Sequence, residues 1–572
     1  MQHEKTIIYQ VLVRLAGNTQ QETRPWGSIS DNGCGKFNDL DTRFLSQIKA
    51  LGANHIWLTG VLEHASCTAY PDHGIEADNP LVIKGMAGSP YAIKDYFDVC
   101  PDLARDPSRR MEEFEHLIAR CHEAGLQPII DFVPNHVARQ YRCDQDAGRE
   151  VSFGKHDASD QAFRKDNNFY YLPGERLELP GEVHALPTAQ NVPHEEFEEN
   201  PAKATGNDCF SSRPSFSDWY ETVKLNYGVD FPGGGAKHFD PPPATWQQML
   251  HIIRFWADKG VRGFRCDMAE MVPVEFWQWL IPQIKQEYPG LLFIGESYNP
   301  QDYARYHHAG FDYLYDKDGF YDTMRSIIQG APAGNLTRVW QSQEGLEEVM
   351  LRFLENHDEE RIASRHFAGH AEAGIPAMAV AATMQKGPLM LYFGQETGEK
   401  AAGESGFSGD DGKTTIFDYD RVPSFQQWFD HGACRNEKLS QAEKDLRNAY
   451  QQILSLGKEA VIRHGHFYDL MWQNPDLPDP AYAYLRWNKQ EIWLVAANFS
   501  NEDYRELPIR IPGHFWEAHG GDEAKSFQIT SAIRPDLRIN GQRETLEHHG
   551  INIALSPWSY DIIKIRSTEQ AT

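Results

Sequence analysis

The stretch TWQQMLHIIRFWADKGVRGFRCD, residues 245–267, holds a helix pattern, a glycine stop and a strand pattern in direct succession. Gly260 ends the amphipathic helix, and Val261 to Asp267 form the strand pattern. Strand side chains alternate between faces, so Arg265 and Asp267 point the same way. An ion pair that points into the interior of a sheet costs desolvation free energy, so such a pair suggests a functional role. The end of this strand is therefore a candidate functional position.

The same order of helix, glycine and strand occurs along most of the chain. It recurs in DTRFLSQIKALGANHIWLTG (41–60), SRRMEEFEHLIARCHEAGLQPIIDFVPNH (108–136) and VEFWQWLIPQIKQEYPGLLFIGES (274–297). Further buried-strand patterns are TIIYQVLVRL (6–15), FDYLYD (311–316), VMLRFLENHD (349–358) and GPLMLYFGQE (387–396). Strands that alternate with helices indicate an α/β fold with a parallel sheet. Counted from Ile7 there are eight strand patterns, the number that closes a (β/α)8 TIM barrel.

Two regions depart from this rhythm. Residues 137–226 are rich in Asp, Asn, Gly and Pro and are too long for a simple loop, which predicts an inserted irregular subdomain after the third strand. After a helix expected near 442–458, the tail contains YAYLRW (482–487), EIWLVAANFS (491–500), YRELPIRI (504–511) and SYDIIKI (559–565), which is typical of an antiparallel β-sandwich. The predicted organisation is a barrel in two parts (1–136 and 227–458), an inserted domain (137–226) and a C-terminal β-sandwich domain (459–572).

Composition excludes several function classes. The 572 residues have a net charge of −27, and without a Lys/Arg run nucleic acid is not expected as a partner. No apolar run approaches the ~20 residues of a membrane helix. The N-terminal MQHEKTIIYQ lacks the basic and apolar regions of a secretion signal, which favours a cytoplasmic location. The eight cysteines are scattered without a CxxC pair, so reduced thiols are expected.

Catalytic groups of a (β/α)8 barrel lie at the carboxyl ends of its strands. Here these ends carry polar residues after apolar runs: Asp131, Asn135 and His136 in DFVPNH, Arg265 and Asp267 in GFRCD, Glu296 in FIGES, and His357 with Asp358 in LENHD. Carboxylates around a cleft suggest glycoside cleavage, in which an acid protonates the leaving oxygen and a carboxylate captures or shields the oxocarbenium-like centre. Neighbouring strand ends permit the carboxyl separation of about 5–5.5 Å found in retaining enzymes.

In this order, DFVPNH, GFRCD, FIGES and LENHD resemble the four signature regions of the α-amylase family (glycoside hydrolase family 13) of retaining glycoside hydrolases and transglycosylases. YAIKDY (91–96) and VKLN (223–226) resemble shorter motifs of the same family, and the eighth strand and the β-rich tail also agree with it. The resemblance covers nearly the whole chain. It implies an α-glucan oligosaccharide as substrate and no cofactor for the chemistry.

The resemblance also implies roles for the site residues. Asp267 would be the nucleophile that forms a glycosyl-enzyme, and Glu296 would be the general acid and then the base. Asp358 would hold sugar hydroxyls and support the transition state.

Four further residues would bind the sugar. Tyr91 would stack on the sugar of the −1 subsite, and His136 and His357 would hydrogen-bond its hydroxyls. Arg265 is expected to keep the neighbouring Asp267 carboxyl ionised, because a nearby cation lowers a carboxylate pKa.

The sequence departs from the family pattern directly after the nucleophile. Many α-amylases have a Lys-His pair that contacts leaving-side sugars and a calcium-linked backbone, whereas DMAEM places Glu270 and Met271 at those positions. This departure weakens the inference of a structural calcium. Asn135 and the Asp-rich insert could still supply oxygen ligands, so Asn135 stays a candidate calcium ligand.

Three functions are compatible with these observations. The favoured one is a hydrolase of α-1,4-glucosidic bonds in maltooligosaccharides or starch. The second is a transglycosylase, an α-glucosidase or a glucoside isomerase similar to trehalose synthase, on the same scaffold. The third, a noncatalytic sugar-binding or transporter-associated homologue, predicts a missing catalytic carboxylate, and all three carboxylates are present.

Two other patterns indicate no separate site. GFSGDDGKTT (406–415) lacks the glycine spacing of a phosphate loop, and its aspartates would repel phosphate. The doublets His307–His308 and His548–His549, like RHGHF at 463–467, lack a third ligand for a metal, so surface or capping roles are expected.

Overall fold

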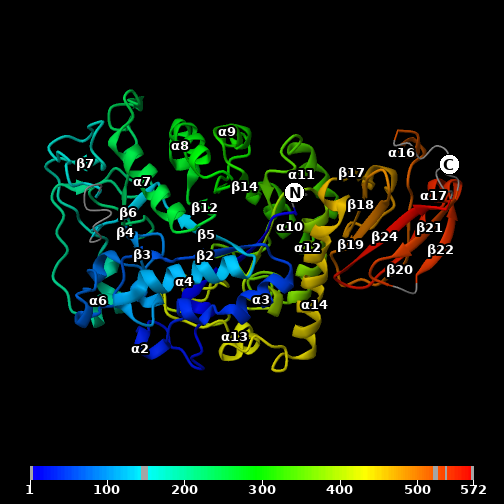
Figure 1. The fold of residues 1–572 in the computed structure, drawn as a ribbon, viewed down its shortest axis with the longest axis horizontal. Coiled ribbons are helices and arrows are strands. Elements are labelled where there is room, and N and C mark those ends of the chain that lie inside the picture. Colours follow the sequence, from blue (N-terminus) through cyan, green and yellow to red (C-terminus); the bar gives the residue numbers. More distant parts are fainter. Residues whose placement is uncertain (1–3, 144–151, 519–525, 535–536, 569–572) are drawn as a thin grey trace.

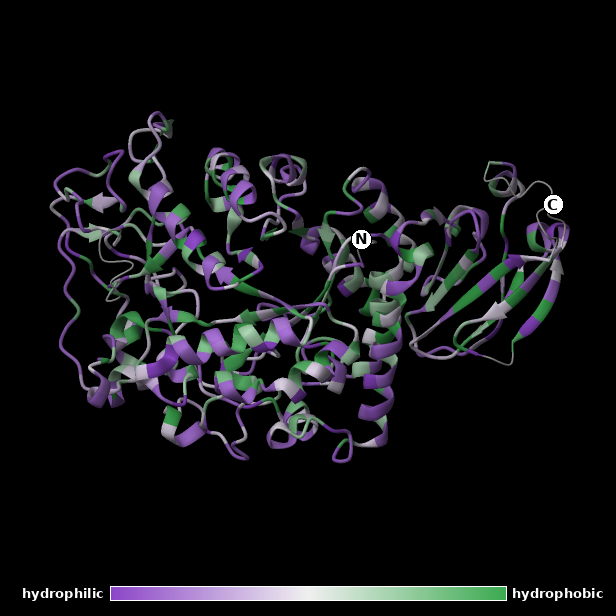
Figure 2. Cartoon of the chain, in the orientation of Figure 1, coloured by the Kyte–Doolittle hydropathy of each residue, from purple (hydrophilic) through white to green (hydrophobic). Residues whose placement is uncertain are grey.

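The computed structural model describes residues 4–143, 152–518, 526–534 and 537–568. Figure 1 shows a large α/β part that extends from the blue N-terminus to the yellow helix α14 (Gln441–Ser455), and beside it a β-rich part in orange and red. In Figure 2, polar residues are spread along the outer loops and helix faces, and hydrophobic residues gather where helices meet strands.

The large part contains eight parallel strands whose order in space is their order along the chain. These strands are β1 (Ile7–Leu12), β2 (His55–Thr59), β5 (Gln127–Phe132), β12 (Gly263–Cys266), β13 (Leu292–Gly295), β14 (Tyr313–Tyr315), β15 (Met350–Leu351) and β16 (Leu389–Tyr392). The first strand pairs with the eighth, with Ile7 opposite Leu389. Between β15 and β16, Arg352 forms a parallel bridge to Leu389, and Met390 N donates to Arg352 O at 2.9 Å. The predicted (β/α)8 barrel is confirmed.

Amphipathic helices cover the barrel. In α3 (Thr42–Leu51), Phe44 and Ile48 belong to the buried face, and the Asp41 carboxylate caps the first turn by accepting from Phe44 N at 2.9 Å. Gly52 ends this helix with φ of 125°, a conformation that favours glycine. The other helices of eight residues or more in the described segments of the barrel are α4 (Arg110–Glu123), α7 (Ala244–Asp258), α8 (Val274–Glu287), α12 (Gly374–Thr383) and α14.

The predicted insert begins and ends on one antiparallel ribbon. Strand β6 (His136–Ala138) follows β5 and pairs with β9 (Thr222–Lys224), so that His136 lies opposite Lys224. Within the insert, β7 (Tyr171–Leu172) pairs with β8 (Ala202–Lys203), and the hairpin of β10 (Val229–Asp230) and β11 (Ala236–Lys237) follows the ribbon. Residues 144–151 of the predicted insert lie outside the described residues.

The C-terminal part consists of antiparallel strands in two sheets. One sheet has the order β17 (His466–Asp469), β18 (Ala481–Trp487), β19 (Ile492–Asn498), β24 (Ser559–Ser567), β21 (Ser526–Ser531) and β22 (Arg538–Gln542), and the other pairs β20 (Tyr504–Ile509) with β23 (Ile551–Leu555). Residues from both sheets, among them Leu494 and Ile553, share one buried core. This arrangement agrees with the predicted C-terminal sandwich.

Buried cations join the barrel to the C-terminal sheet. Arg486 of β18 donates to the carbonyls of Thr383 and Met384 at 3.0 Å each, at the end of α12, and also to Gly465 O at 2.9 Å. Lys5 donates to Ala382 O at 2.8 Å from the barrel side. Cations at a helix C-terminus satisfy carbonyls that have no partner within the helix.

In the part of the chain that the structure describes, no two cysteines form a disulfide. Among the residues that the structure describes, no helix combines the length and apolar character needed to cross a membrane.

Candidate active site

The strand register brings the predicted catalytic carboxylates together. Cys266 of β12 lies opposite Gly295 of β13, so the next residues, Asp267 and Glu296, are neighbours at the carboxyl edge. A backbone bond extends this register, because Glu296 N donates to Cys266 O at 3.1 Å, beyond the last paired residue of β13. On the other side of β12, Asp267 N donates to Phe132 O of β5 at 2.8 Å.

Arg265 lies at the centre of this edge, with its side chain only 1% exposed. Its Nη1 lies 2.6 Å from Asp267 Oδ1 and 3.6 Å from Asp131 Oδ1. Its Nη2 lies 2.8 Å from Glu296 Oε1, and its Nε donates to Tyr315 OH at 3.2 Å. One guanidinium therefore connects three carboxylates that come from three adjacent strands.

Two of these carboxyls, Asp267 and Asp131, hold their protons more tightly than isolated ones. Burial raises the pKa of Asp267; Arg265 opposes this effect, and the charge of Glu296 reinforces it. Burial also raises the pKa of Asp131 against the effect of Arg265. Arg265 lowers the pKa of Asp267, as expected. Burial and the charge of Glu296 outweigh this effect, so the pKa of Asp267 is raised, contrary to the expectation that Arg265 keeps this carboxyl ionised. Three buried carboxylates around one cation favour retention of a proton within the cluster.

Both oxygens of Glu296 accept hydrogen bonds. Met268 N donates to Oε2 at 2.7 Å, and Tyr298 OH donates to Oε1 at 2.5 Å. Met268 adopts a φ of 46°, a left-handed conformation that is unfavourable for a residue with a side chain and is typical of functional sites. The backbone after Asp267 thus turns so that its N–H points at Glu296.

His357 connects Asp358, the third predicted catalytic carboxylate, to Tyr91. Its Nε2 lies 2.6 Å from Tyr91 OH and 3.0 Å from Asp358 Oδ2, and its Nδ1 lies 2.9 Å from Gln10 Nε2. The rings of Tyr91 and His357 are stacked, with centroids 5.2 Å apart. Burial raises the pKa of Asp358, but His357 and Arg265 outweigh it and lower the pKa to about 2, so this carboxyl is ionised at neutral pH. The Asp358 side chain is 39% exposed and faces solvent at the mouth of the site.

A comparison with known families shows the family to which the chain belongs. The family model described as the catalytic domain of α-amylase matches residues 30–455. The chain belongs to the α-amylase family. It is thus an enzyme of a glycoside hydrolase family.

The relatives with described functions are distant. The chain is 24% identical over 508 residues to "Alpha-amylase MalA" of Haloarcula japonica, a match that covers 87% of this chain and 56% of that protein. Over 283 residues it is 21% identical to an α-1,4-glucan:maltose-1-phosphate maltosyltransferase of Picrophilus torridus, which covers 48% of this chain and 33% of that protein. The chain therefore spans about half of the first relative and one third of the second.

A solved structure supports the same fold. The α-amylase of Geobacillus thermoleovorans, complexed with acarbose, superposes with a TM-score of 0.61 at 17% identity, and the alignment covers 99% of both chains. This likeness includes the barrel, the insert and the C-terminal sheets.

The predicted −1 subsite residue His136 occupies the first position of β6. It is 3% exposed and packs against Trp219 with ring centroids 5.2 Å apart. Burial, followed by the charge of Lys224, lowers the pKa of His136 to about 3, so the imidazole is neutral at physiological pH. A neutral imidazole can both donate and accept a hydrogen bond, as a sugar hydroxyl requires.

The residues around Asn135 do not fit a calcium ion. Asn135 Oδ1, the oxygen that would ligate calcium, accepts a hydrogen bond from Lys224 Nζ. The same buried ammonium lies 2.7 Å from Asp208 Oδ1 and 3.2 Å from Met271 O. A bound ammonium and a divalent cation exclude each other at one set of oxygens, so we propose that Asn135 binds the Lys224 ammonium in place of calcium. Lys224 belongs to VKLN, the motif quoted without a residue role.

Chelation tests this conclusion. We expect EDTA to leave the unfolding temperature of the protein unchanged, because the ammonium already neutralises the oxygen cluster. Lys224→Met should destabilise the fold by about 3 kcal/mol, since it leaves buried oxygens without their cation. Differential scanning calorimetry with and without EDTA measures both effects, and Lys203→Met, a lysine of the same insert that is paired with Glu199, is the control. A lower unfolding temperature in EDTA that returns to its original value when calcium is added would contradict the conclusion.

The shared proton of the cluster predicts a shift of the pH profile. The charge of Asp131 raises the pKa of Asp267. Asp131→Asn should therefore let Asp267 stay ionised to lower pH and should move the acid limb of kcat/KM down by about half a unit. The measurement is kcat/KM against pH on maltoheptaose, with Asp476→Asn on the exposed C-terminal surface as control. An acid limb that stays in place, or moves up, would speak against a common proton.

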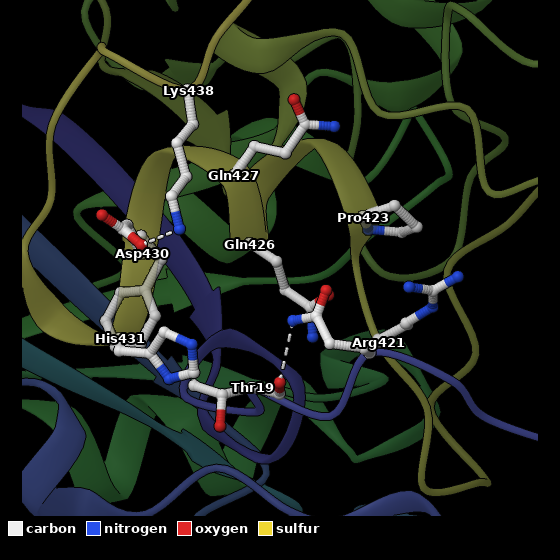
Figure 3. Close-up of a pocket in the computed structure, with 10 residues that line it drawn as sticks. Thr19, Arg421, Pro423, Gln426, Gln427, Asp430, His431 and Lys438 are labelled. Atoms are coloured by element: carbon white, nitrogen blue, oxygen red, sulfur yellow. Dashed lines mark hydrogen bonds and ion pairs between the residues drawn. The ribbon is translucent and has the colours of Figure 1, made fainter.

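A cavity elsewhere in the barrel holds none of the predicted site residues. Figure 3 shows it lined by Gln426, Asp430, His431 and Lys438, and its volume is about 160 Å³. Asp430 Oδ2 lies 2.8 Å from Arg435 Nη2, and Gln426 donates to Asn18 O at 2.7 Å, so these polar groups are partnered. The candidate active site therefore stays at the carboxyl ends of the strands.

Three contacts of the site were not assigned from the sequence. Tyr298 touches Glu296, Gln10 lies beside His357, and Glu270 contacts the loop after Glu296. Tyr298 lies two residues after Glu296, and Glu270 differs from the Lys-His pair of many family members. Both residues could therefore have been noticed in the sequence. Gln10, inside the first strand pattern, offered only its polar character in an apolar run.

Proposed function

We propose that the protein is a retaining α-glycoside hydrolase that cleaves α-1,4-glucosidic bonds of maltooligosaccharides or starch-type glucans. The observation that carries this proposal is the contact of Asp267 and Glu296 with the same guanidinium. A shared arginine holds the two carboxyls close together, as the separation of about 5–5.5 Å in retaining enzymes requires.

The first half of the reaction uses one proton of the carboxyl pair. Glu296 as general acid gives its proton to the glycosidic oxygen while Asp267, ionised, attacks C1. The bond from C1 to the leaving oxygen breaks, and an ester bond from C1 to Asp267 forms. The reaction needs one proton shared by the pair, and burial around Arg265 favours retention of such a proton.

In the second half, Glu296 as general base takes a proton from water. The oxygen of that water attacks C1 and releases the Asp267 carboxylate. Asp358, kept ionised beside His357, accepts hydrogen bonds from sugar hydroxyls and stabilises the positive charge that develops on the ring. Tyr91, His136 and His357 form the wall of the −1 subsite.

The α-glucan substrate is supported by the relatives. MalA is named an α-amylase, and the superposed Geobacillus enzyme is complexed with acarbose. The net charge of −27 also fits a neutral oligosaccharide.

A second candidate, transfer of the glycosyl unit to a sugar instead of water, is favoured by one observation. The loop after Asp267 carries Glu270, whose carboxylate accepts hydrogen bonds from the loop after Glu296, in place of the Lys-His pair that contacts leaving-side sugars in many family members. One of the relatives is named a maltosyltransferase, which indicates transfer of a maltosyl unit by that protein.

Product analysis separates these reactions. The protein is incubated with maltoheptaose, maltose or sucrose, with Asp267→Asn as blank. Shorter maltooligosaccharides with new reducing ends, first released as the α-anomer in NMR spectra, would support the retaining hydrolase. Longer or rearranged sugars without net hydrolysis would support transfer or isomerisation, and first release of the β-anomer would contradict retention.

A further inference from the structure

Glu270 connects the two loops that carry the proposed catalytic carboxylates. It belongs to the 3₁₀ turn Ala269–Met271 that follows Asp267. Its Oε2 accepts from Tyr298 N at 2.9 Å, from Ser297 Oγ at 3.0 Å and from Asn299 N at 3.2 Å. All three donors lie in the loop directly after Glu296, so one carboxylate oxygen holds the start of that loop.

This loop has few other anchors at its start. Asn299 and Pro300 are exposed, and helix α9 begins only at Tyr303. The backbone N–H groups of Tyr298 and Asn299 find their acceptor in Glu270. Because a backbone donor needs a partner, the carboxylate defines where the chain runs after Glu296.

The fixed backbone determines where the Tyr298 side chain lies. Its ring is half-buried and packs against the aromatic and aliphatic cluster inside the barrel mouth. Its hydroxyl donates to Glu296 Oε1 at 2.5 Å. Tyr298 is therefore held at both ends, by Glu270 at its backbone N–H and by Glu296 at its hydroxyl.

The hydroxyl contact bears on proton transfer. A hydrogen bond donated to a carboxylate favours its ionised form. Tyr298 OH donates to Oε1 of Glu296 and Met268 N donates to Oε2, so each oxygen of this carboxyl has one donor. Of these two donors, the tyrosine hydroxyl is on a side chain that can rotate away, whereas the N–H belongs to the backbone.

We propose that Glu270 is a positioning residue that holds the Tyr298 hydroxyl on Glu296 and thereby sets the pH range in which this carboxyl works as acid and base. The proposal rests on the proposed function of Glu296. It assigns a role to the residue that replaces part of the Lys-His pair of other family members.

Other charged and titratable groups surround this contact. Those around Glu296 and Tyr298 are Arg265 from β12, Asp267 directly after β12, Asp131 from β5, Tyr315 from β14 and Asp358 from the loop after β15. Those near Glu270 are Tyr303 and Tyr306 from α9 and Asp318 from the turn after β14. Substitution of Glu270 or Tyr298 leaves all of them in place.

The direction of the pH shift separates positioning from a simple charge effect. Tyr298→Phe removes the donor, so Glu296 should stay protonated to higher pH. The alkaline limb of the kcat/KM profile should therefore move to higher pH by about half a pH unit to one pH unit. Glu270→Ala should raise the limb in the same direction and lower kcat/KM by about tenfold to a hundredfold through misplacement. If Glu270 acted only through its negative charge, its removal would favour ionised Glu296 and the limb would fall.

Three further variants complete the experiment. Glu270→Gln keeps an acceptor oxygen for the loop and should stay near the wild-type profile. The double variant Glu270→Ala with Tyr298→Phe should shift the limb no further than Tyr298→Phe alone, because both act through one contact. Glu275→Ala, at the start of α8 and paired with Lys237, is the matched control and should leave the limb unmoved.

A stability cycle gives a readout that needs no turnover. Urea unfolding of wild type, Glu270→Ala, Tyr298→Phe and the double variant should show non-additive free energies of unfolding. Additive effects together with an unmoved or lowered alkaline limb would overturn the proposal. If the wild type cleaves no glycoside while the stability cycle is non-additive, the proposed function fails and the positioning contact stands.

Discussion

Asp267→Asn is expected to lower kcat on maltoheptaose by about 10⁴-fold or more, because an amide cannot form the ester bond to C1 that the retaining reaction requires. The asparagine oxygen can still accept from Arg265 Nη1, now 2.6 Å from Asp267 Oδ1, so the fold and the subsite should persist. Steady-state kinetics measures the loss, and isothermal titration with maltoheptaose should show binding close to that of the wild type.

The surface variant Asp476→Asn is a matched control, since that side chain is 89% exposed and lies in the C-terminal part. It carries the same chemical change without contact to the cluster and should leave kcat unchanged. Turnover of Asp267→Asn near the wild-type rate would remove Asp267 from the proposed role.

Glu296→Gln is expected to show a loss that depends on the leaving group. On maltoheptaose, kcat should fall by about 10²- to 10⁴-fold, because no acid protonates the departing oxygen. On α-maltosyl fluoride, whose fluoride leaves without protonation, the first step should be largely preserved. The second step lacks its base, so the glycosyl-enzyme should accumulate and appear in intact-protein mass spectra as the mass of one maltosyl unit.

The double variant Asp267→Asn with Glu296→Gln is the control, and it should show no adduct. The alkaline limb of the pH profile should also disappear in Glu296→Gln, since a glutamine side chain does not titrate. Equal losses on both substrates, with no adduct at any time, would contradict the acid/base role.

The sequence was informative wherever one local pattern decides the outcome. The helix–glycine–strand units predicted the barrel, because amphipathic period and glycine stops act over a few residues. The predicted strand from Val261 to Asp267 is shorter in the structure, where β12 spans Gly263–Cys266, yet Asp267 N still bonds to the neighbouring strand. The helix expected near 442–458 is observed as α14, which ends at Ser455 and continues as a 3₁₀ turn, Leu456–Lys458.

The carboxylates of the site were also visible in the sequence, as polar ends of apolar strands. A barrel collects the carboxyl ends of its strands at one rim, so Asp267 and Glu296, which are 29 positions apart in numbering, had to be neighbours once the strands were identified. Asp358 and His357 follow for the same reason. Their polar character at the ends of apolar strands marked them as candidates, and the resemblance to the family supplied their expected roles.

Other features depend on the combined electrostatic and hydrogen-bond contributions of residues that are distant in sequence. Only the tertiary structure decided these features. The pKa of Asp267 follows from burial and two further carboxylates as well as from its neighbour Arg265, so the local pair predicted the wrong net direction. The ammonium of Lys224 reaches Asn135 across 89 positions and occupies the oxygen that Asn135 would offer to a calcium ion. Glu270 was recognised by sequence as a departure from a family pattern, but its acceptor role required the loop after Glu296 to lie against it. Periodicity along the chain thus determined the barrel and the rim at which its polar strand ends meet. Charge balance and hydrogen-bond partners within that rim were decided by folding, because electrostatic and hydrogen-bond energies depend on distance in space.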